Sequence, residues 1–173
     1  MPITASKTPA SLTWANFTVV TNLVDPHDNT PQDAVTAFDY VIPTMPPRQV
    51  SGRWYLAQTF TIRITPNAKV RQGATQTAAL LAHEQVHYDV GFVIARQLAR
   101  ELERLSARDL PTLSQRFNDC VNLHFHRRAG LIQHRYDLDT RHSLNKHYQA
   151  VWDKMMRDCL ANASATMIGG WYL

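Results

Sequence analysis

Two histidines and a glutamate stand together in the segment His83-Glu84-Gln85-Val86-His87. On a helix, residues four apart share a face and lie about 6 Å from each other, so both imidazoles can reach one ion. Glu84 then projects beside them, toward a water molecule on that ion. This HExxH spacing is typical of zinc peptidases, in which the metal lowers the pKa of the water and the glutamate takes its proton.

A catalytic zinc site needs a third protein ligand and leaves the fourth tetrahedral position for water. Glu101 cannot be that ligand, because an unbroken helix would place it about 21 Å beyond His87. Position 93 is Val, where the metzincin pattern requires a histidine. The remaining candidates lie in the second half of the chain: His124, His126, His134, Asp137, Asp139, His142 and His147.

The HExxH segment lies within a sequence that has the period of a helix. Apolar residues recur every three or four positions from Leu80 to Leu105, which predicts one long amphipathic helix over residues 76–106, with Gly91 as its weak point. Two more helices, joined by the polar segment 136–142, are expected at residues 111–135 and 144–161.

The chain before this helix is rich in β-branched and aromatic residues. Three strands are expected there, at residues 12–20, 34–42 and 53–65. The stretches between them, 25–33 and 43–52, contain Pro, Asp, Asn and Gly and are expected to be loops. We therefore expect one α+β domain over residues 1–173. A small β-sheet in the β-rich part, 1–74, precedes the helical part, 75–173, which carries the metal site.

The composition argues against several other classes of protein. The net charge is +4, but it is divided evenly: residues 1–75 hold six Lys and Arg against four Asp, and residues 76–173 hold twelve against ten acids. Four arginines recur every four residues from Arg96 to Arg108; without a nucleic-acid motif beside them, they are interpreted as a solvated face.

No apolar run approaches the ~20 residues of a membrane span. Cys120 and Cys159 could form a disulfide or remain two thiols.

Four segments of the chain together resemble a bacterial family. They are Ser11-Leu-Thr-Trp14-Ala-Asn-Phe17, Leu80-Leu-Ala-His-Glu-Gln-Val-His87-Tyr-Asp, Tyr136-Asp137-x-x-Thr140-x-His142 and Gln149-x-x-Trp152. In this order they are similar to the family catalogued as domain of unknown function 922 (DUF922), which is described as secreted zinc-dependent proteases. The resemblance implies a single-domain, zincin-like metallopeptidase of bacterial origin. It also implies a secreted or periplasmic location, although the first residues show no export signal.

The resemblance also implies roles for individual residues. His83 and His87 match the metal ligands, and Glu84 matches the catalytic base. The segment 136–142 supplies the third ligand, for which His142 is favoured over Asp137, with Asp139 as an outside candidate. Ser143 stands where the family usually has Gly.

Further roles follow from the needs of a zinc peptidase. Tyr136 or His147 could donate a hydrogen bond to the oxyanion of the reaction intermediate. Asp137 or Asp139, if it is not a ligand, could accept the second N–H of a ligating histidine. Asp89 does not share the helical face of His87 and is expected to be a surface charge or a cap partner.

The function that these features predict is zinc-dependent hydrolysis of a peptide or amide bond in a peptide, a protein or a peptidoglycan peptide. The loops 25–33 and 43–52 are expected to set the specificity. Two alternatives remain open: a zinc-binding protein without catalysis and, less favoured, a basic helical nucleic-acid-binding module. The oligomeric state has no signal in the sequence.

Overall fold

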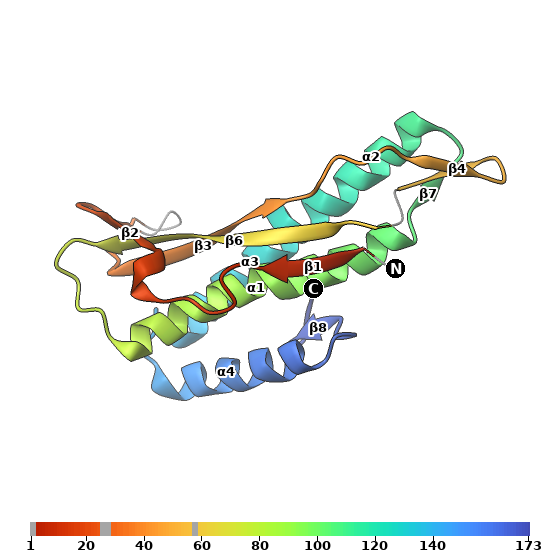
Figure 1. The fold of residues 1–173 in the computed structure, drawn as a ribbon. Coiled ribbons are helices and arrows are strands. Elements are labelled where there is room, and N and C mark those ends of the chain that lie inside the picture. The colour runs from red at the N-terminus through yellow and green to blue at the C-terminus, as the bar shows by residue number, and fades with distance from the viewer. Residues whose placement is uncertain (1–2, 25–28, 57–58) are drawn as a thin grey trace.

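The computed structural model describes residues 3–24, 29–56 and 59–173, and it has an α+β fold. A four-stranded sheet lies along one side of the long helix α1 (Ala78–Glu103), and α4 (Lys146–Ala161) lies along the opposite side (Figure 1). The strands of this sheet are β1 (Thr4–Lys7), β2 (Phe17–Val20), β3 (Ala34–Val41) and β6 (Thr61–Arg71).

Strand β6 is the centre of the sheet, because all three other strands pair with it. β1 and β2 run parallel to it along one edge, opposite Thr61–Ile64 and Ala68–Arg71 respectively. β3 runs antiparallel along the other edge and places Phe38 opposite Pro66. Pro66 lacks an N–H, and it lies at the gap between β1 and β2, so neither of these strands loses a hydrogen bond to it.

The strand predicted at residues 34–42 is confirmed as β3. The prediction for 12–20 is wrong in its first half, because Trp14–Asn16 forms a 3-10 turn and only Phe17–Val20 is extended. The Asn16 side chain accepts a hydrogen bond from the Thr13 amide at 2.8 Å, which stabilises the turn over the extended form.

The strand predicted at 53–65 is wrong in its extent. Its start is a separate strand, β5 (Arg53–Tyr55), and its end belongs to β6, which continues past Pro66. β5 forms a second small sheet with β7 (Ser106–Ala107) and with β4 (Arg48–Val50), a strand inside the expected loop 43–52. Of the other expected loop, residues 25–28 lie outside the described part of the chain.

The predicted long helix is confirmed as α1, and the predicted last helix as α4. Between them the chain is helical for longer than expected: α2 (Leu110–Val121), the π-helical segment η2 (Asn122–Arg128) and α3 (Ala129–Thr140) follow one another directly. The predicted polar connection 136–142 is therefore wrong, since most of it is the end of α3. The chain ends in a hairpin of β8 (Met167–Ile168) and β9 (Trp171–Tyr172).

The core lies between the sheet and α1, and between α1 and the later helices. On β6 the alternate residues Ile62, Ile64, Ala68 and Val70 are buried, as a strand with one covered face requires. Gly91 packs directly against Phe38 of β3, and a Cβ on Gly91 would overlap the Phe38 ring. The predicted weak point of the helix is thus a packing requirement.

Candidate metal centre

Helix α1 holds the HExxH segment inside the protein. The helix begins after Thr77, whose side chain accepts a hydrogen bond from the Leu80 amide at 3.1 Å. The sheet and helices α3 and α4 then cover the next turns. His83, Glu84 and His87 are consequently 2%, 1% and 6% exposed, and the local fold buries three polar side chains that need partners.

Three ligand atoms from α1 and α3 converge on one position. His83 Nε2 lies 3.3 Å from His87 Nε2, and Asp137 Oδ1 lies 2.9 Å from His87 Nε2 and 3.2 Å from His83 Nε2. Zinc bonds of about 2.0–2.1 Å in a tetrahedron separate the ligand atoms by about 3.3 Å. The separations therefore fit one zinc ion.

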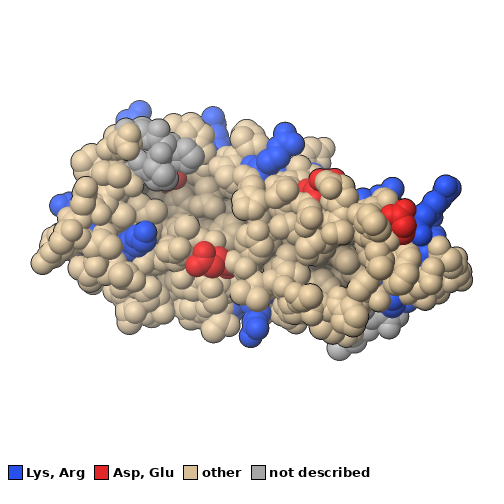
Figure 2. Space-filling view, turned by 90° about the horizontal axis from the view of Figure 1, so that it is seen from above, with Lys and Arg blue, Asp and Glu red and all other residues tan. Residues whose placement is uncertain are grey.

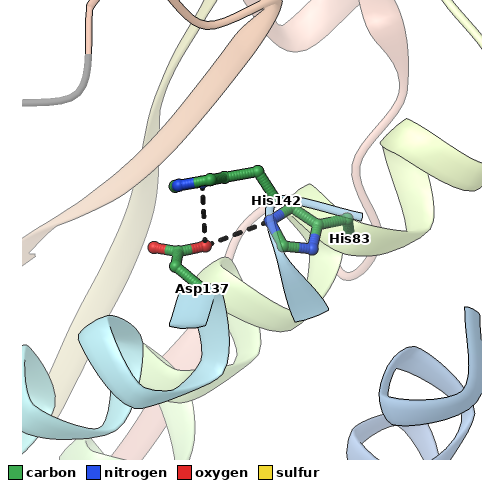
Figure 3. A group of neighbouring side chains, drawn as sticks. All are labelled: His83, Asp137 and His142. Carbon is green, nitrogen blue, oxygen red and sulfur yellow. Dashed lines mark ion pairs between the residues drawn. The ribbon is translucent and has the colours of Figure 1, made fainter. Parts of the chain in front are cut away.

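His142, the favoured third ligand, also reaches this place. Its Nδ1 lies 3.6 Å from Asp137 Oδ1, and His83, Asp137 and His142 present ligand atoms within 4.8 Å of one another (Figure 3). His142 stands on a turn after α3 in which Arg141, His142 and Ser143 all have left-handed backbones, with φ of 49°, 51° and 73°. The structure thus brings both leading candidates to the histidine pair, and Asp137 is within 3.2 Å of both histidines.

The carboxylate of Glu84 has an unsatisfied oxygen. Among the described residues nothing hydrogen-bonds Glu84 Oε2 or the Thr36 hydroxyl on β3, although both are buried. A buried polar atom without a partner is costly, and such atoms often mark a place where a ligand, ion or water binds. Glu84 and Thr36 line one cavity, so both atoms suit a site that takes up such a partner.

This cavity has a volume of about 680 Å³ and opens over the ligand cluster. Its walls come from β3 and the residues before it, from the first turns of α1, from α3 and from the left-handed turn. Cavities of roughly 300–1,000 Å³ are typical of small-molecule and substrate sites. Two residues with perturbed pKa values, His87 and Asp137, lie on its wall.

His87 and Asp137 hold opposite charges in the absence of metal. Burial alone would lower the pKa of His87, but the Asp137 carboxylate, with smaller contributions from Glu84 and Gln133, raises it to about 9. Burial alone would raise the pKa of Asp137, but the charge of His87 and the hydrogen bonds from both histidines lower it well below its usual range. A proton shared by these groups therefore occupies the place where a cation fits.

Tyr136 lies beneath the site instead of facing the cavity. It is fully buried, its ring stacks on the His83 ring at 4.6 Å, and its hydroxyl lies 3.2 Å from the His83 carbonyl and within 3.0 Å of the Gln149 amide. Burial raises its pKa. This placement suits a residue that supports His83, and it does not bring the hydroxyl to the reacting face as the predicted oxyanion role requires.

The other candidates lie away from the cluster or at its margin. Asp139 accepts hydrogen bonds from Arg135 and from the Trp152 indole at 3.1 Å each. His147 is exposed at the start of α4, and His126 lies 3.3 Å from the Tyr40 hydroxyl. His134 lines the cavity.

Asp89, predicted to be a surface charge or cap partner, is 5% exposed, so that prediction is wrong. Its carboxylate forms an ion pair with Lys7 of β1 and accepts a hydrogen bond from Gln85 at 3.0 Å. Gln85 in turn accepts a hydrogen bond from the Leu12 amide at 2.7 Å. These contacts hold Lys7 and Leu12 against the side of α1 that faces away from the ligand cluster.

A second group of metal-ligand side chains lies at the far end of α1. Glu101, Cys120 and His124 present ligand atoms within 4.8 Å of one another. A positive charge is already there, because Arg128 Nη1 lies 3.0 Å from His124 Nε2 and 3.7 Å from Glu101 Oε1. Burial raises the pKa of the Cys120 thiol to about 12, with Glu101 adding to the effect, so the thiol stays protonated. Cys120 and Cys159 are both free thiols.

Two of the four arginines of the stripe, Arg96 and Arg100, lie on α1 and bind carbonyl groups within the fold. Arg96 donates hydrogen bonds to the carbonyls of Cys159 and Leu160, at 2.6 and 3.0 Å. Arg100 donates to the carbonyls of Ala163 and Ala165. On the face seen in Figure 2, Lys and Arg are scattered among other residues instead of forming one patch. None of the described helices is long and apolar enough to cross a membrane.

Sequence reasoning missed two glutamines beside the ligand histidines. Gln149 Oε1 lies 3.1 Å from His83 Nδ1, and Gln133 Oε1 lies 3.2 Å from His87 Nδ1. The expected acceptors of these N–H groups were Asp137 or Asp139, and neither has that position. Gln149 belongs to the Gln149-x-x-Trp152 segment, which was its only signal, and Gln133 had none.

Comparison with known proteins identifies a family for this part of the chain. Residues 58–143 match the model of a family described as bacterial protein of unknown function, DUF922. The match extends from the residues before β6 to the turn after α3, so it includes His83, His87, Asp137 and His142. No curated protein and no solved structure matches the chain.

Proposed function

Because this chain belongs to the bacterial family DUF922, which is described only as being of unknown function, we propose a function from its own site: metal-dependent hydrolysis of a peptide or amide bond. His83 and His87 would hold Zn²⁺ with Asp137 as third ligand. His142, beside Asp137, faces the same position. When bound, zinc supplies Lewis acidity, which polarises a carbonyl and makes a water molecule more acidic.

The observation that carries this proposal is the combination of the converging ligand atoms with the unsatisfied Glu84 carboxylate. Glu84 Oε2 is buried and lacks a partner among the described residues, so it can accept the proton of an attacking water. The same oxygen can then return that proton to the leaving amine. The side chains of His83, Glu84 and His87 are at most 6% exposed, and this burial strengthens the interactions of their charges.

The cavity supports a peptide or protein substrate, including the peptide of peptidoglycan. It is large enough for several residues of an extended chain, and one wall is the edge strand β3, whose outer backbone groups are not paired within the sheet. An exposed strand edge can pair with an extended peptide. The same proposal includes the zincin-like character of the fold and the secreted or periplasmic location that the family resemblance implies.

The decisive experiment compares Glu84→Gln with the parent protein. We expect the variant to bind one equivalent of zinc but to lose at least 100-fold of the turnover of a fluorogenic peptide library, because the amide cannot accept a proton. Glu103→Gln, the same change at the other end of α1, serves as the control and should keep full activity. Anomalous scattering at the zinc edge would identify the third ligand.

Two outcomes would overturn the proposal. If purification without chelators and incubation with zinc leave less than about 0.2 equivalents of bound metal, the site is not a metal centre. If zinc binds and no peptide or peptidoglycan fragment is hydrolysed by the parent protein, the zinc has a non-catalytic role.

A further inference from the structure

The two ligand histidines are each held by a glutamine from a different helix. His83 contacts Gln149 of α4, and His87 contacts Gln133 of α3, in both cases through Nδ1 and the amide oxygen. The Nε2 atoms of the same rings point at the convergence with Asp137. Each imidazole therefore has one nitrogen at the metal position and the other on a glutamine.

An amide oxygen can only accept a hydrogen bond, so each Nδ1 must carry the proton. In a neutral imidazole the Nε2 lone pair is then bare, which is the form that binds a cation. The opposite tautomer would place two acceptors against each other at Nδ1. The glutamines thus keep a proton on Nδ1 of each ring, so that loss of any second proton frees Nε2, the nitrogen that faces the ion.

The orientation of the Gln149 amide is itself determined by its neighbours. Its Nε2 donates to Asp153 Oδ1 at 2.8 Å, and it lies 2.7 Å from the Tyr136 hydroxyl. A flipped amide would direct its oxygen at the Asp153 carboxylate, which would be repulsive. Asp153 therefore fixes the orientation of the Gln149 amide, and Gln149 in turn fixes the tautomer of His83.

We propose that Gln133 and Gln149 are positioning residues of the metal centre, which fix the tautomer and the ring orientation of His87 and His83. This inference rests on the proposed function, because it concerns the same ion. Acceptors of this kind commonly account for about 10–100-fold in metal affinity. Because glutamine is neutral, the orientation is achieved without adding charge to the pair formed by His87 and Asp137.

The test measures zinc affinity by competition with a chromophoric chelator in four variants. Gln133→Met and Gln149→Met keep the length of the side chain but remove the acceptor, and each is expected to weaken zinc binding about 10–100-fold. Gln133→Glu keeps a hydrogen-bond acceptor for His87 Nδ1, so its zinc affinity should be close to that of the parent protein. Gln115→Met is the matched control, since Gln115 is a helical glutamine bonded to Asp119 four residues on, at 2.8 Å, just as Gln149 is bonded to Asp153.

Nitrogen-15 spectra of the histidine rings provide a readout that packing alone would not move. In the parent protein and in Gln133→Glu, His87 should show a protonated Nδ1 that exchanges slowly, and in Gln133→Met this signal should be lost. If the parent binds zinc and both Met variants bind it as tightly as Gln115→Met, the inference is wrong and the metal site stands. If the parent itself binds no zinc, the proposed function fails instead.

Discussion

The Asp137 carboxylate and the His87 imidazole stabilise each other's charge in a buried place where neither would be stable alone. The distance between His87 Nε2 and Asp137 Oδ1 is 2.9 Å, and the pKa values of the two groups move apart as a result. A metal ion must displace the proton that His87 holds. Zinc uptake is therefore coupled to pH through this pair.

The stability of the metal-free protein should accordingly fall as the pH rises from about 6.5 to about 9. The pKa of His87 is raised to about 9 in the folded protein. The protonated His87 imidazole therefore stabilises the protein fully below its unfolded pKa near 6.5, and this stabilisation is lost as the pH passes 9. Thermal melts in the presence of a chelator, at steps of pH, measure this. Asp137→Asn, which removes the partner charge, should flatten the dependence.

Zinc-loaded protein should show the opposite trend over the same pH range, because protons compete with the ion. Equal slopes for the loaded and the metal-free protein would contradict the assignment of His87 as a ligand. The lowered pKa of Asp137 has a separate effect. The ionised Asp137 carboxylate stabilises the protein above the unfolded pKa near 3.9, and this stabilisation is lost only at more acid pH.

Single residues differ in how well the sequence predicts their place. His83, Glu84 and His87 could be predicted because helix geometry alone brings residues four apart to one face. Asp137 and His142 needed the resemblance, since they come from the end of α3 and the turn after it. The contacts of Gln133 and Gln149 with the histidine rings could not be predicted, because a helical glutamine has the same pattern whether it faces solvent or a buried ring.

At the scale of elements, α1 carries the site and β3 determines how closely the sheet can approach it. Gly91→Ala should destabilise the protein by roughly 1–3 kcal/mol, because the added Cβ would meet three Phe38 ring atoms within 2.9 Å. Gly130→Ala, on α3 with open space around it, is the control and should stabilise by about 0.5–1 kcal/mol. Urea denaturation of both variants measures the difference, and equal effects would contradict the packing role of Gly91.

The helices were more predictable than the strands for a physical reason. The apolar period of α1 is a local signal that repeats over many turns, and it gave bounds within three residues of Ala78–Glu103. The strands depend on pairing with β6, which is more than 50 residues from the partners in β1. Thr4–Lys7 is short and partly polar, so it becomes a strand only because β6 offers an edge.

At the scale of the whole molecule, the apolar core does not pass through the metal centre. It joins sheet, α1 and the later helices through residues such as Ile62, Ile94 and Trp152, all at most 2% exposed. A chain of this length buries enough surface to fold without a metal. The ion would then add stability to a fold that already exists.

Removal of metal should therefore leave a folded protein with a lower melting temperature. At 100 times Kd, bound zinc would stabilise the native state by about 2.7 kcal/mol, which corresponds to about 5–10 °C for a chain of this size. Circular dichroism with and without chelator measures both the fold and the shift. Complete unfolding by the chelator would show that the metal is structural.

The left-handed turn at Arg141–Ser143 has a consequence for the rate at which the site exchanges its ion. Each of these three non-glycine residues gives up about 1–2 kcal/mol by adopting such a backbone. Local opening of the turn recovers that free energy, whereas the α1 ligands can leave only if a buried helix unravels. The turn is therefore the part of the cavity wall that can open with the smallest loss of free energy, and its opening would speed the exchange of an ion.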